Sequence, residues 1–145
     1  MLVAEPDHED EARIRLARIG FDHVLGALGD PLCAFADHPD AVEQSSRLTV
    51  VELADRLESV AGLQLVDVRG PGEVEDGTIG GATHMQLPEL VSRAGELDPH
   101  RPTVVFCAGG FRSSIAASTL RAHGFADVSD LLGGYTAWRR ELSVT

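Results

Sequence analysis

The feature that most constrains the fold of this chain is an apolar strand that runs through a glycine-rich turn into a helix. Thr103–Cys107 has the sequence TVVFC, and an uninterrupted apolar run of this length is typical of a central strand buried on both faces of a parallel sheet. Two glycines follow, and Arg112–His123 has the residue spacing of a helix that Gly124 ends. Sheets of this kind bind ligands where strands end and helices begin, so this junction is the candidate site.

Strands and helices alternate over the rest of the chain from residue 48 onward. The predicted strands are Leu48–Val50, Leu63–Val68, Ala82–Met85 and Asp127–Leu131, and the predicted helices are Val51–Val60, Leu87–Leu97 and Tyr135–Leu142. Arg69–Gly81, which contains Pro71 and several glycines, is predicted to be a loop with at most one turn of helix. This alternation predicts an α/β fold, with a mostly parallel sheet of about five strands and helices on both faces.

Composition limits the partners of the protein. The chain has 145 residues and a net charge of −11, and all its basic side chains other than histidine are arginines, which argues against nucleic acid or an anionic membrane as a partner. No apolar run reaches the roughly 20 residues that cross a bilayer, and Met1–Glu11 lacks the order of a signal peptide, so we expect a cytoplasmic protein. The histidines show no metal-ligand spacing and the two cysteines are too few for a four-cysteine site, so we expect no metal and no cofactor.

The N-terminal segment resembles the last third of the chain. When Gly20-Phe21 is aligned with Gly124-Phe125, an offset of 104 positions, Leu16 falls on Leu120 and Val24 on Val128. The same offset places Val3 on Cys107, so the N-terminal copy has no cysteine at that position. We interpret the segment as a degenerate half repeat, and the alternative is chance similarity between two amphipathic helices.

A polar stretch separates this segment from the domain that follows it. Asp37–Ser46 contains a proline and has the composition of a linker. We therefore expect an N-terminal extension of a strand and a helix, with its linker, over residues 1–45 and the main domain over residues 46–145. An unpaired strand at Leu2–Ala4 would be an edge through which a homodimer could form. Cys33 is expected to be a packing residue, and the alternative role is that of a resolving thiol.

The loop after the central strand has the features of an anion cradle around Cys107. Gly109 and Gly110 allow a positive φ, so several backbone N–H groups can point inward at the sulfur. The positive end of the following helix and the charge of Arg112 add to this field. Each effect favours the thiolate and lowers the pKa of Cys107. The structural alternative is a buried cysteine that happens to lie beside a glycine-rich turn.

Four stretches of the sequence resemble the rhodanese-like sulfurtransferases. The loop Cys107-Ala108-Gly109-Gly110-Phe111-Arg112-Ser113 resembles the active-site loop of that family, and the other three stretches are Leu65–Arg69 with Glu73, Gly77–His84, and Gly133–Trp138. Two residues depart from the family pattern. Thr78 stands where histidine is usual and Gly80 where proline is usual, and we expect both to loosen that loop.

The resemblance implies a sulfurtransferase. Cys107 would take sulfane sulfur from thiosulfate or a low-molecular persulfide and pass it, as a persulfide, to a thiol or to cyanide. The loop residues 108–113 would bind the sulfur, Arg112 would hold the anionic donor and Ser113 would donate a hydrogen bond. Arg69 either reaches the donor or, as we expect, pairs with Glu73, and Asp67 is expected to brace backbone amides.

Two other functions remain as alternatives. Four residues separate Cys107 from Arg112, whereas the related phosphatases of cell-cycle type, and arsenate reductases built on them, have five. The shorter loop suits a single sulfur better than a tetrahedral phosphate, which favours sulfur transfer. The other alternative is a rhodanese fold used only for binding or regulation, against which the intact Cys107 loop argues.

A second resemblance concerns longer proteins. The first 36 residues, together with the run from Cys107 to Ser118, resemble the C-terminal end of bacterial proteins that fuse a metallo-β-lactamase-like domain to rhodanese units. The chain contains no His-x-His-x-Asp-His motif of that metal domain. The resemblance implies glutathione persulfide or another low-molecular thiol as the sulfur partner.

Overall fold

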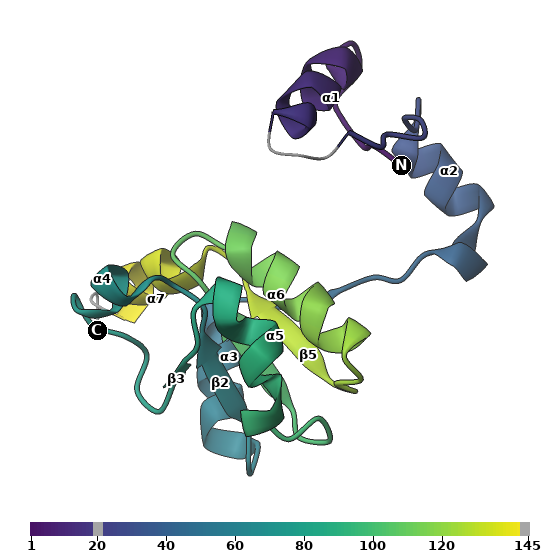
Figure 1. The fold of residues 1–145 in the computed structure, drawn as a ribbon. Coiled ribbons are helices and arrows are strands. Elements are labelled where there is room, and N and C mark those ends of the chain that lie inside the picture. The colour runs from purple at the N-terminus through teal and green to yellow at the C-terminus, as the bar shows by residue number, and fades with distance from the viewer. Residues whose placement is uncertain (19–21, 143–145) are drawn as a thin grey trace. The chain divides into compact units, whose positions relative to one another are not determined.

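The computed structural model describes residues 1–18 and 22–142, and the chain forms two compact units, Met1–Gln44 and Ser45–Thr145 (Figure 1). The unit boundary lies next to the one expected from the sequence. Gly20 and Phe21, on which the alignment of the half repeat was set, lie outside the described residues. Each unit is described by itself below.

The second unit contains a five-stranded sheet with the strand order β1-β5-β4-β2-β3, and every neighbouring pair is parallel. The strands are β1 (Ser46–Leu48), β2 (Gln64–Asp67), β3 (Thr83–His84), β4 (Thr103–Phe106) and β5 (Val128–Leu131). The predicted α/β fold is confirmed. The predicted apolar strand is β4, the central strand of the sheet. A central strand is buried on both faces, which explains its apolar sequence.

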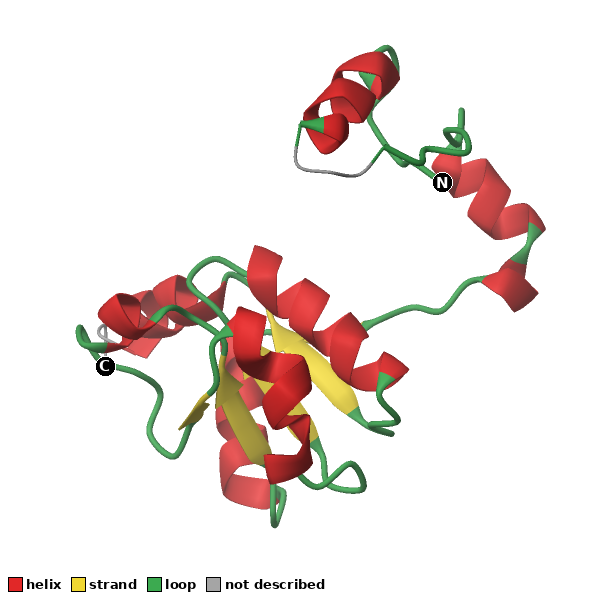
Figure 2. Ribbon diagram, viewed as in Figure 1, coloured by secondary structure: helices red, strands yellow, loops and turns green. Residues whose placement is uncertain are grey.

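Helices cover both faces of this sheet (Figure 2). They are α3 (Val50–Ser59), α4 (Pro71–Val74), α5 (Leu90–Arg93), α6 (Phe111–Ala122) and α7 (Gly134–Leu142), with short 3₁₀ turns η2 (Leu87–Glu89) and η3 (Ala94–Glu96). Residues of α5 and α6 share one hydrophobic cluster, and residues of α3 and α7 share the other. The one-turn helix α4 lies within the predicted loop, as expected.

The strands supply both clusters because neighbouring residues point to opposite faces. Val105 packs in the cluster with α5 and α6, whereas Val104 packs in the cluster with α3 and α7, and neither side chain is exposed. Val66 and Leu65 divide in the same way on the adjacent strand β2. This two-sided burial explains why both strands have apolar runs rather than an alternating pattern.

Two helix predictions need correction. Helix α3 begins at Val50 because Thr49 caps it: the Thr49 hydroxyl accepts a hydrogen bond from the Glu52 amide, and the Glu52 carboxylate accepts one of 2.7 Å from the Thr49 amide. The single helix predicted over residues 87–97 is instead the succession η2, α5 and η3. Pro88 has no N–H to donate and Gly95 has a low helix propensity, so no regular helix spans that segment.

The first unit contains α1 (Glu9–Ala17), α2 (Pro31–Asp37) and η1 (Pro39–Ala41). Instead of the predicted strand at Leu2–Ala4, Leu2 forms one parallel bridge with Ala27. Helix α2 was not predicted, although Asp30 is its N-cap and accepts a hydrogen bond from the Cys33 amide. Cys33 is exposed, so the expectation that it is a packing residue is wrong.

The elements of the first unit match those of the second at the same offset of 104 positions. The bridge between Leu2 and Ala27 corresponds to Phe106 and Leu131, the next pair in the register of β4 and β5 after Val105 and Asp130. The range of α1 shifts to positions inside α6, and the range of α2 to positions inside α7. These correspondences support the hypothesis of a half repeat.

Within the described ranges 1–18 and 22–142, no helix is both long and apolar enough to cross a lipid bilayer.

Candidate active site

The candidate site lies where the central strand ends. Strand β4 ends at Phe106, so Cys107 is the first residue of the loop rather than the last residue of the strand, as the sequence analysis expected. The loop turns back at Gly110, which has a φ of 100° and is the N-cap of α6. A residue with a side chain is strained at this φ, which explains the glycine. The turn brings the amide of Gly110 back toward the Cys107 side chain.

Two polar groups contact the sulfur of Cys107, and a third holds one of them in place. The Gly110 amide donates a hydrogen bond of 3.1 Å to Sγ. In the thiol form, the S–H group donates to the Ser113 hydroxyl at 3.6 Å, and that hydroxyl donates to the Gly110 carbonyl at 3.1 Å. Cys107 is 1% exposed, so its sulfur is buried within this cradle.

Two opposing effects determine the pKa of Cys107. Burial by itself raises the pKa, because it disfavours the charged thiolate. Hydrogen bonding from the side chain and amide of Ser113, and from the amides of Gly110 and Gly109, lowers the pKa and outweighs burial. The result is a thiol whose pKa lies below its ordinary value, as the glycine-rich loop predicted.

The N-terminus of α7 holds the other side of the loop. The amide of Tyr135 donates to the Cys107 carbonyl at 2.7 Å, and the amide of Thr136 donates to the Ala108 carbonyl at 3.0 Å. A Cβ atom at Gly134 would collide with the carbonyl oxygen of Cys107 and with the backbone of Ala108. The two carbonyls therefore point away from the cradle, which leaves its inner side to amide donors.

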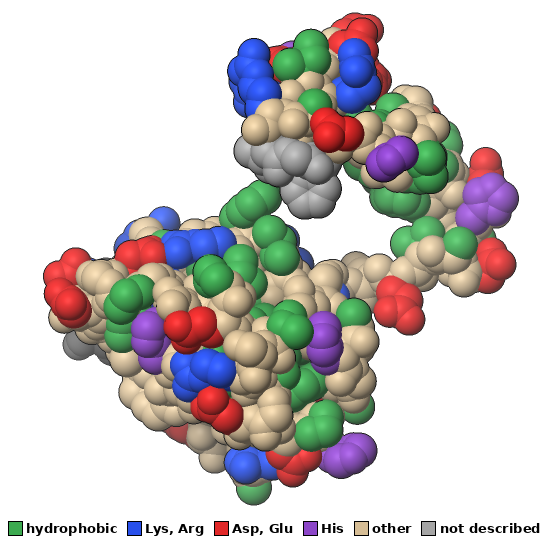
Figure 3. Space-filling view, viewed as in Figure 1, with side chains coloured by type: hydrophobic (Ala, Val, Ile, Leu, Met, Phe, Trp, Pro, Cys, Tyr) green, Lys and Arg blue, Asp and Glu red, His purple; other side chains and the backbone are tan. Residues whose placement is uncertain are grey.

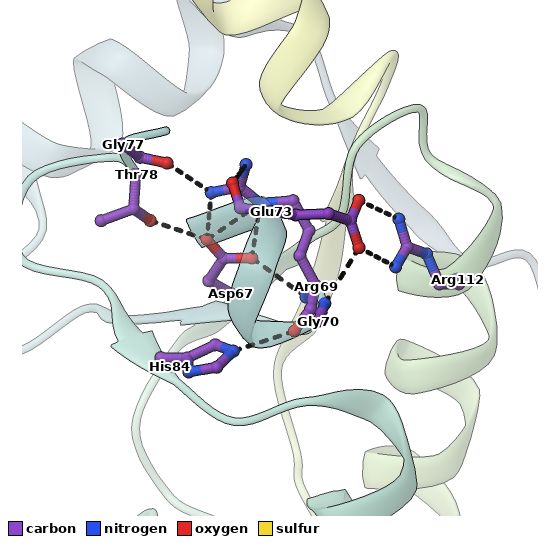
Figure 4. A network of polar contacts seen from close by, with 8 residues as sticks. All are labelled: Asp67, Arg69, Gly70, Glu73, Gly77, Thr78, His84 and Arg112. Carbon is purple, nitrogen blue, oxygen red and sulfur yellow. Dashed lines mark hydrogen bonds and ion pairs between the residues drawn. The ribbon is translucent and has the colours of Figure 1, made fainter. Parts of the chain in front are cut away.

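Asp67 and Arg69 form a buried ion pair beside the site (Figure 4). The Arg69 guanidinium donates to both carboxylate oxygens of Asp67, the shortest bond being 2.6 Å, and the Arg69 amide also donates to Asp67. The guanidinium lies 4.1 Å from the ring centroid of Tyr135, the residue whose amide holds Cys107. Asp67 braces a backbone amide as expected. The predicted ion pair of Arg69 with Glu73 is wrong, because Arg69 pairs with Asp67 and donates to the backbone carbonyl of Glu73 rather than to its carboxylate.

The loop that contains Thr78 is anchored rather than loosened by its departure from the family pattern. The Thr78 hydroxyl donates a hydrogen bond of 2.7 Å to the Asp67 carboxylate, and the Gly77 carbonyl accepts one from Arg69 (Figure 4). His84 lies on the other side of Arg69, where its Nε2 is 2.9 Å from the Arg69 carbonyl. These contacts give His84 and Thr78 structural roles.

Glu73 pairs with Arg112. The guanidinium of Arg112 donates two hydrogen bonds, of 2.6 and 2.7 Å, to the two carboxylate oxygens of Glu73, and the Gly70 amide donates a third of 3.0 Å (Figure 4). These bonds lower the pKa of Glu73 to about 2 and raise that of Arg112. Arg112 lies at the rim as predicted and also interacts with the Cys107 sulfur, but its main partner is Glu73, whose carboxylate compensates its charge.

Arg47 and Asp130 form a third ion pair, which the sequence analysis did not identify. Arg47 donates two hydrogen bonds of 3.1 Å to the fully buried carboxylate of Asp130. A Cβ atom at Gly110 would lie 3.8 Å from the Arg47 guanidinium, so this pair lies next to the loop. An aspartate within the predicted strand Asp127–Leu131 was the available signal, since a buried charge needs a partner.

The remaining loop residues differ in exposure. Ala108 is partly buried, Gly109 is exposed, and the Phe111 side chain is 80% exposed. Ser113 is fully buried beside the sulfur. The structure thus brings Cys107, Gly110 and Ser113 into direct contact and leaves Phe111 directed to solvent.

Comparison with known proteins shows the family of the chain. Residues 49–141 match the family model described as the rhodanese-like domain. The chain is 40% identical over 75 residues to the uncharacterized protein YqhL of Bacillus subtilis, a match that covers 52% of this chain and 60% of that protein. It is 37% identical over 91 residues to the thiosulfate sulfurtransferase GlpE of Shewanella oneidensis, covering 63% of this chain and 89% of the relative.

Solved structures show the same fold. The solution structure of the rhodanese-like domain of the Anabaena protein Alr3790 superimposes with a TM-score of 0.62 and 35% sequence identity, covering 68% of this chain and 76% of that chain. The residues that match the family model include the strands β2 to β5, the loop at Cys107, helix α6 and most of helix α7.

Proposed function

Because the chain belongs to the rhodanese-like domain family, we propose that it is a thiosulfate or persulfide sulfurtransferase that carries sulfane sulfur on Cys107. The observation that supports this most directly is the amide of Gly110, 3.1 Å from the sulfur, in a loop whose Cys107 and Ala108 carbonyls are bound by α7. A cradle of donors stabilises an anion on sulfur, whether it is the thiolate or the outer sulfur of a persulfide.

The proposed reaction has two displacements on sulfur. The Cys107 thiolate attacks the outer sulfur of thiosulfate, an S–S bond forms, and the S–S bond of the donor breaks as sulfite leaves with its electron pair. An acceptor thiolate or cyanide then attacks the outer sulfur of the Cys107 persulfide. The second S–S bond breaks, and Cys107 leaves as the thiolate that begins the next cycle.

The Ser113 hydroxyl can form a hydrogen bond with the sulfur of Cys107 in both the thiol and the thiolate form. In the thiol form its hydroxyl accepts from Cys107 and donates to the Gly110 carbonyl. A hydroxyl carries one proton, so in the thiolate form it must rotate and donate to Sγ instead. Ser113 thereby stabilises the reactive form without a general base in the site.

The donor proposed from the second resemblance is a low-molecular persulfide such as glutathione persulfide. The correspondence of α1 with α6 and of α2 with α7 supports a relationship of the N-terminal segment to a second rhodanese unit. In the fusion proteins that the N-terminal segment resembles, the metallo-β-lactamase-like domain oxidises a persulfide. That oxidation would then supply or consume the sulfur that Cys107 carries.

The proposed activity is tested by intact-protein mass spectrometry after incubation with thiosulfate. The wild-type protein and Cys33→Ser should each gain the mass of one sulfur atom, and a thiol or cyanide should remove it. Cys107→Ser should gain none. A protein that gains no sulfur from thiosulfate or from a persulfide, or equal gain in Cys107→Ser, would overturn the proposal, and stable persulfide without transfer to any acceptor would favour a binding module.

A further inference from the structure

Three arginines lie around the loop at Cys107, and each is held by its own carboxylate. Arg112 is bound by Glu73, Arg69 by Asp67 and Arg47 by Asp130, each through two or more hydrogen bonds. The structure therefore places three cations near the site without a net positive charge from any of the three pairs. Attraction of an anion then depends on the loop amides and the N-terminus of α6.

The electrostatic field of the rest of the protein does not supply the positive charge that would attract an anionic donor to the site. The chain has a net charge of −11. On the face of the second unit visible in Figure 3, blue and red side chains are interspersed and form no continuous basic patch. A donor with two negative charges is therefore disfavoured unless one arginine exchanges its carboxylate for the donor.

The pair of Glu73 and Arg112 is the one that such an exchange would involve. Arg112 belongs to the loop itself, and the side chains of Arg112 and Glu73 are 36% and 40% exposed. Asp67 and Asp130 are fully buried, so removing their arginines would leave buried charges unpaired. Glu73 is thus the carboxylate that an incoming anion has to displace.

We propose that Glu73 is a specificity-determining residue which, by occupying Arg112, selects persulfide donors with a single negative charge at sulfur over dianionic donors such as thiosulfate. This inference rests on the proposed function and names the donor class of the same site. The low pKa of Glu73, about 2, means that the carboxylate stays ionised throughout the pH range in which sulfur chemistry occurs. The preference for persulfide donors over dianionic donors should therefore not change with pH in this range.

Glu73→Gln tests the proposal because glutamine is similar in size and keeps an oxygen that can accept from the Gly70 amide, while the negative charge is removed. The matched control is Glu96→Gln, which removes the same charge from the two hydrogen bonds that Glu96 makes with Arg93, in the segment formed by α5 and η3. The first measurement is alkylation of Cys107 by iodoacetate, an anion, and by neutral iodoacetamide, followed on the Cys107 peptide. The ratio of the two rates should rise about fivefold in Glu73→Gln and stay at the wild-type value in Glu96→Gln.

The second measurement is kcat/KM with thiosulfate and with 2-hydroxyethyl persulfide. The thiosulfate value should rise relative to the persulfide value by about the same factor in Glu73→Gln alone. Unchanged ratios in a folded Glu73→Gln would overturn this inference while leaving the sulfurtransferase proposal intact. Absence of sulfur transfer in every protein would instead overturn the proposed function, and the alkylation ratio would still report the charge at the site.

A measurement on the wild-type protein keeps the inference testable if Glu73→Gln does not fold. Sulfate, an unreactive dianion, should slow alkylation of Cys107 by iodoacetamide no more than chloride does at matched ionic strength. Selective protection by sulfate would show that Arg112 is available to dianions and would overturn the inference.

Discussion

The backbone N–H of Tyr135 donates a hydrogen bond of 2.7 Å to the carbonyl of Cys107, so the last helix of the domain holds the peptide group of the proposed nucleophile. The ring of the same tyrosine stacks on the Arg69 guanidinium. Tyr135 thus connects the loop at Cys107 to the buried ion pair of Arg69 and Asp67.

Gly134→Ala should distort the loop. The new Cβ would collide with the Cys107 carbonyl, and alanine is also strained at the φ of 57° observed for Gly134. We expect unfolding free energy to fall by at least about 2 kcal/mol and persulfide formation to be lost. Urea titration and intact mass measure the two effects. Gly80→Ala, where a Cβ would meet nothing within 4 Å, should behave as wild type.

Ser113→Ala should raise the pKa of Cys107, because it removes the hydroxyl that stabilises the thiolate. The rate of alkylation by iodoacetamide, measured against pH, should reach its midpoint at a higher pH than in the wild-type protein. Ser114→Ala is the matched control, since that hydroxyl donates to the Phe111 carbonyl and does not contact the sulfur. A coincident profile for Ser113→Ala would contradict the proposed role of the hydroxyl.

Asp67→Asn should destabilise the domain strongly. It leaves the charge of Arg69, which is 3% exposed, without a counter-ion, and it weakens the hydrogen bond from Thr78. We expect a loss of about 3–5 kcal/mol in unfolding free energy, measured by urea titration. Asp130→Asn should cost less, because its partner Arg47 is 45% exposed and can be hydrated. Equal losses would mean that burial of the arginine does not determine the cost.

Stability should depend on pH through Glu73. Its pKa is about 2 in the folded protein against an ordinary value of 4.5, so the unfolded chain binds this proton first as the pH falls. The stabilisation is therefore complete above pH 4.5 and is lost as the pH falls toward 2. Glu73→Gln should lose less stability than wild type between pH 6 and pH 3 in urea titrations, as should Arg112→Gln. Equal slopes in the three proteins would exclude a contribution from the ion pair.

Much of the fold could be predicted from local sequence. The apolar run at Thr103–Cys107, the alternation around it and the glycines after it predict a parallel α/β sheet with Cys107 at the end of its central strand. Hydrophobic periodicity and backbone preferences act over a few residues, so they can be read along the chain. The Thr49-x-x-Glu52 capping box is a signal of the same kind that could have placed the start of α3 correctly.

The pairing of charges could not be predicted in this way. Glu73 is close to Arg69 in sequence, so their pairing was expected, yet the fold brings Glu73 to Arg112 and Asp67 to Arg69. A carboxylate pairs with whichever cation the packed strands and helices place within a few ångströms of it, and sequence separation does not measure that distance. The same reason explains why the contact of Arg47 with Asp130 was not predicted.

The sequence by itself determined the proposed reactive atom and its immediate setting: a cysteine in a loop of glycine amides at the start of a helix. Only the tertiary structure decided how much charge surrounds that atom. The loop itself supplies the backbone donors. The net charge of the site depends instead on the carboxylates of Asp67, Glu73 and Asp130, which lie on β2, α4 and β5. In this protein those carboxylates bind all three neighbouring arginines.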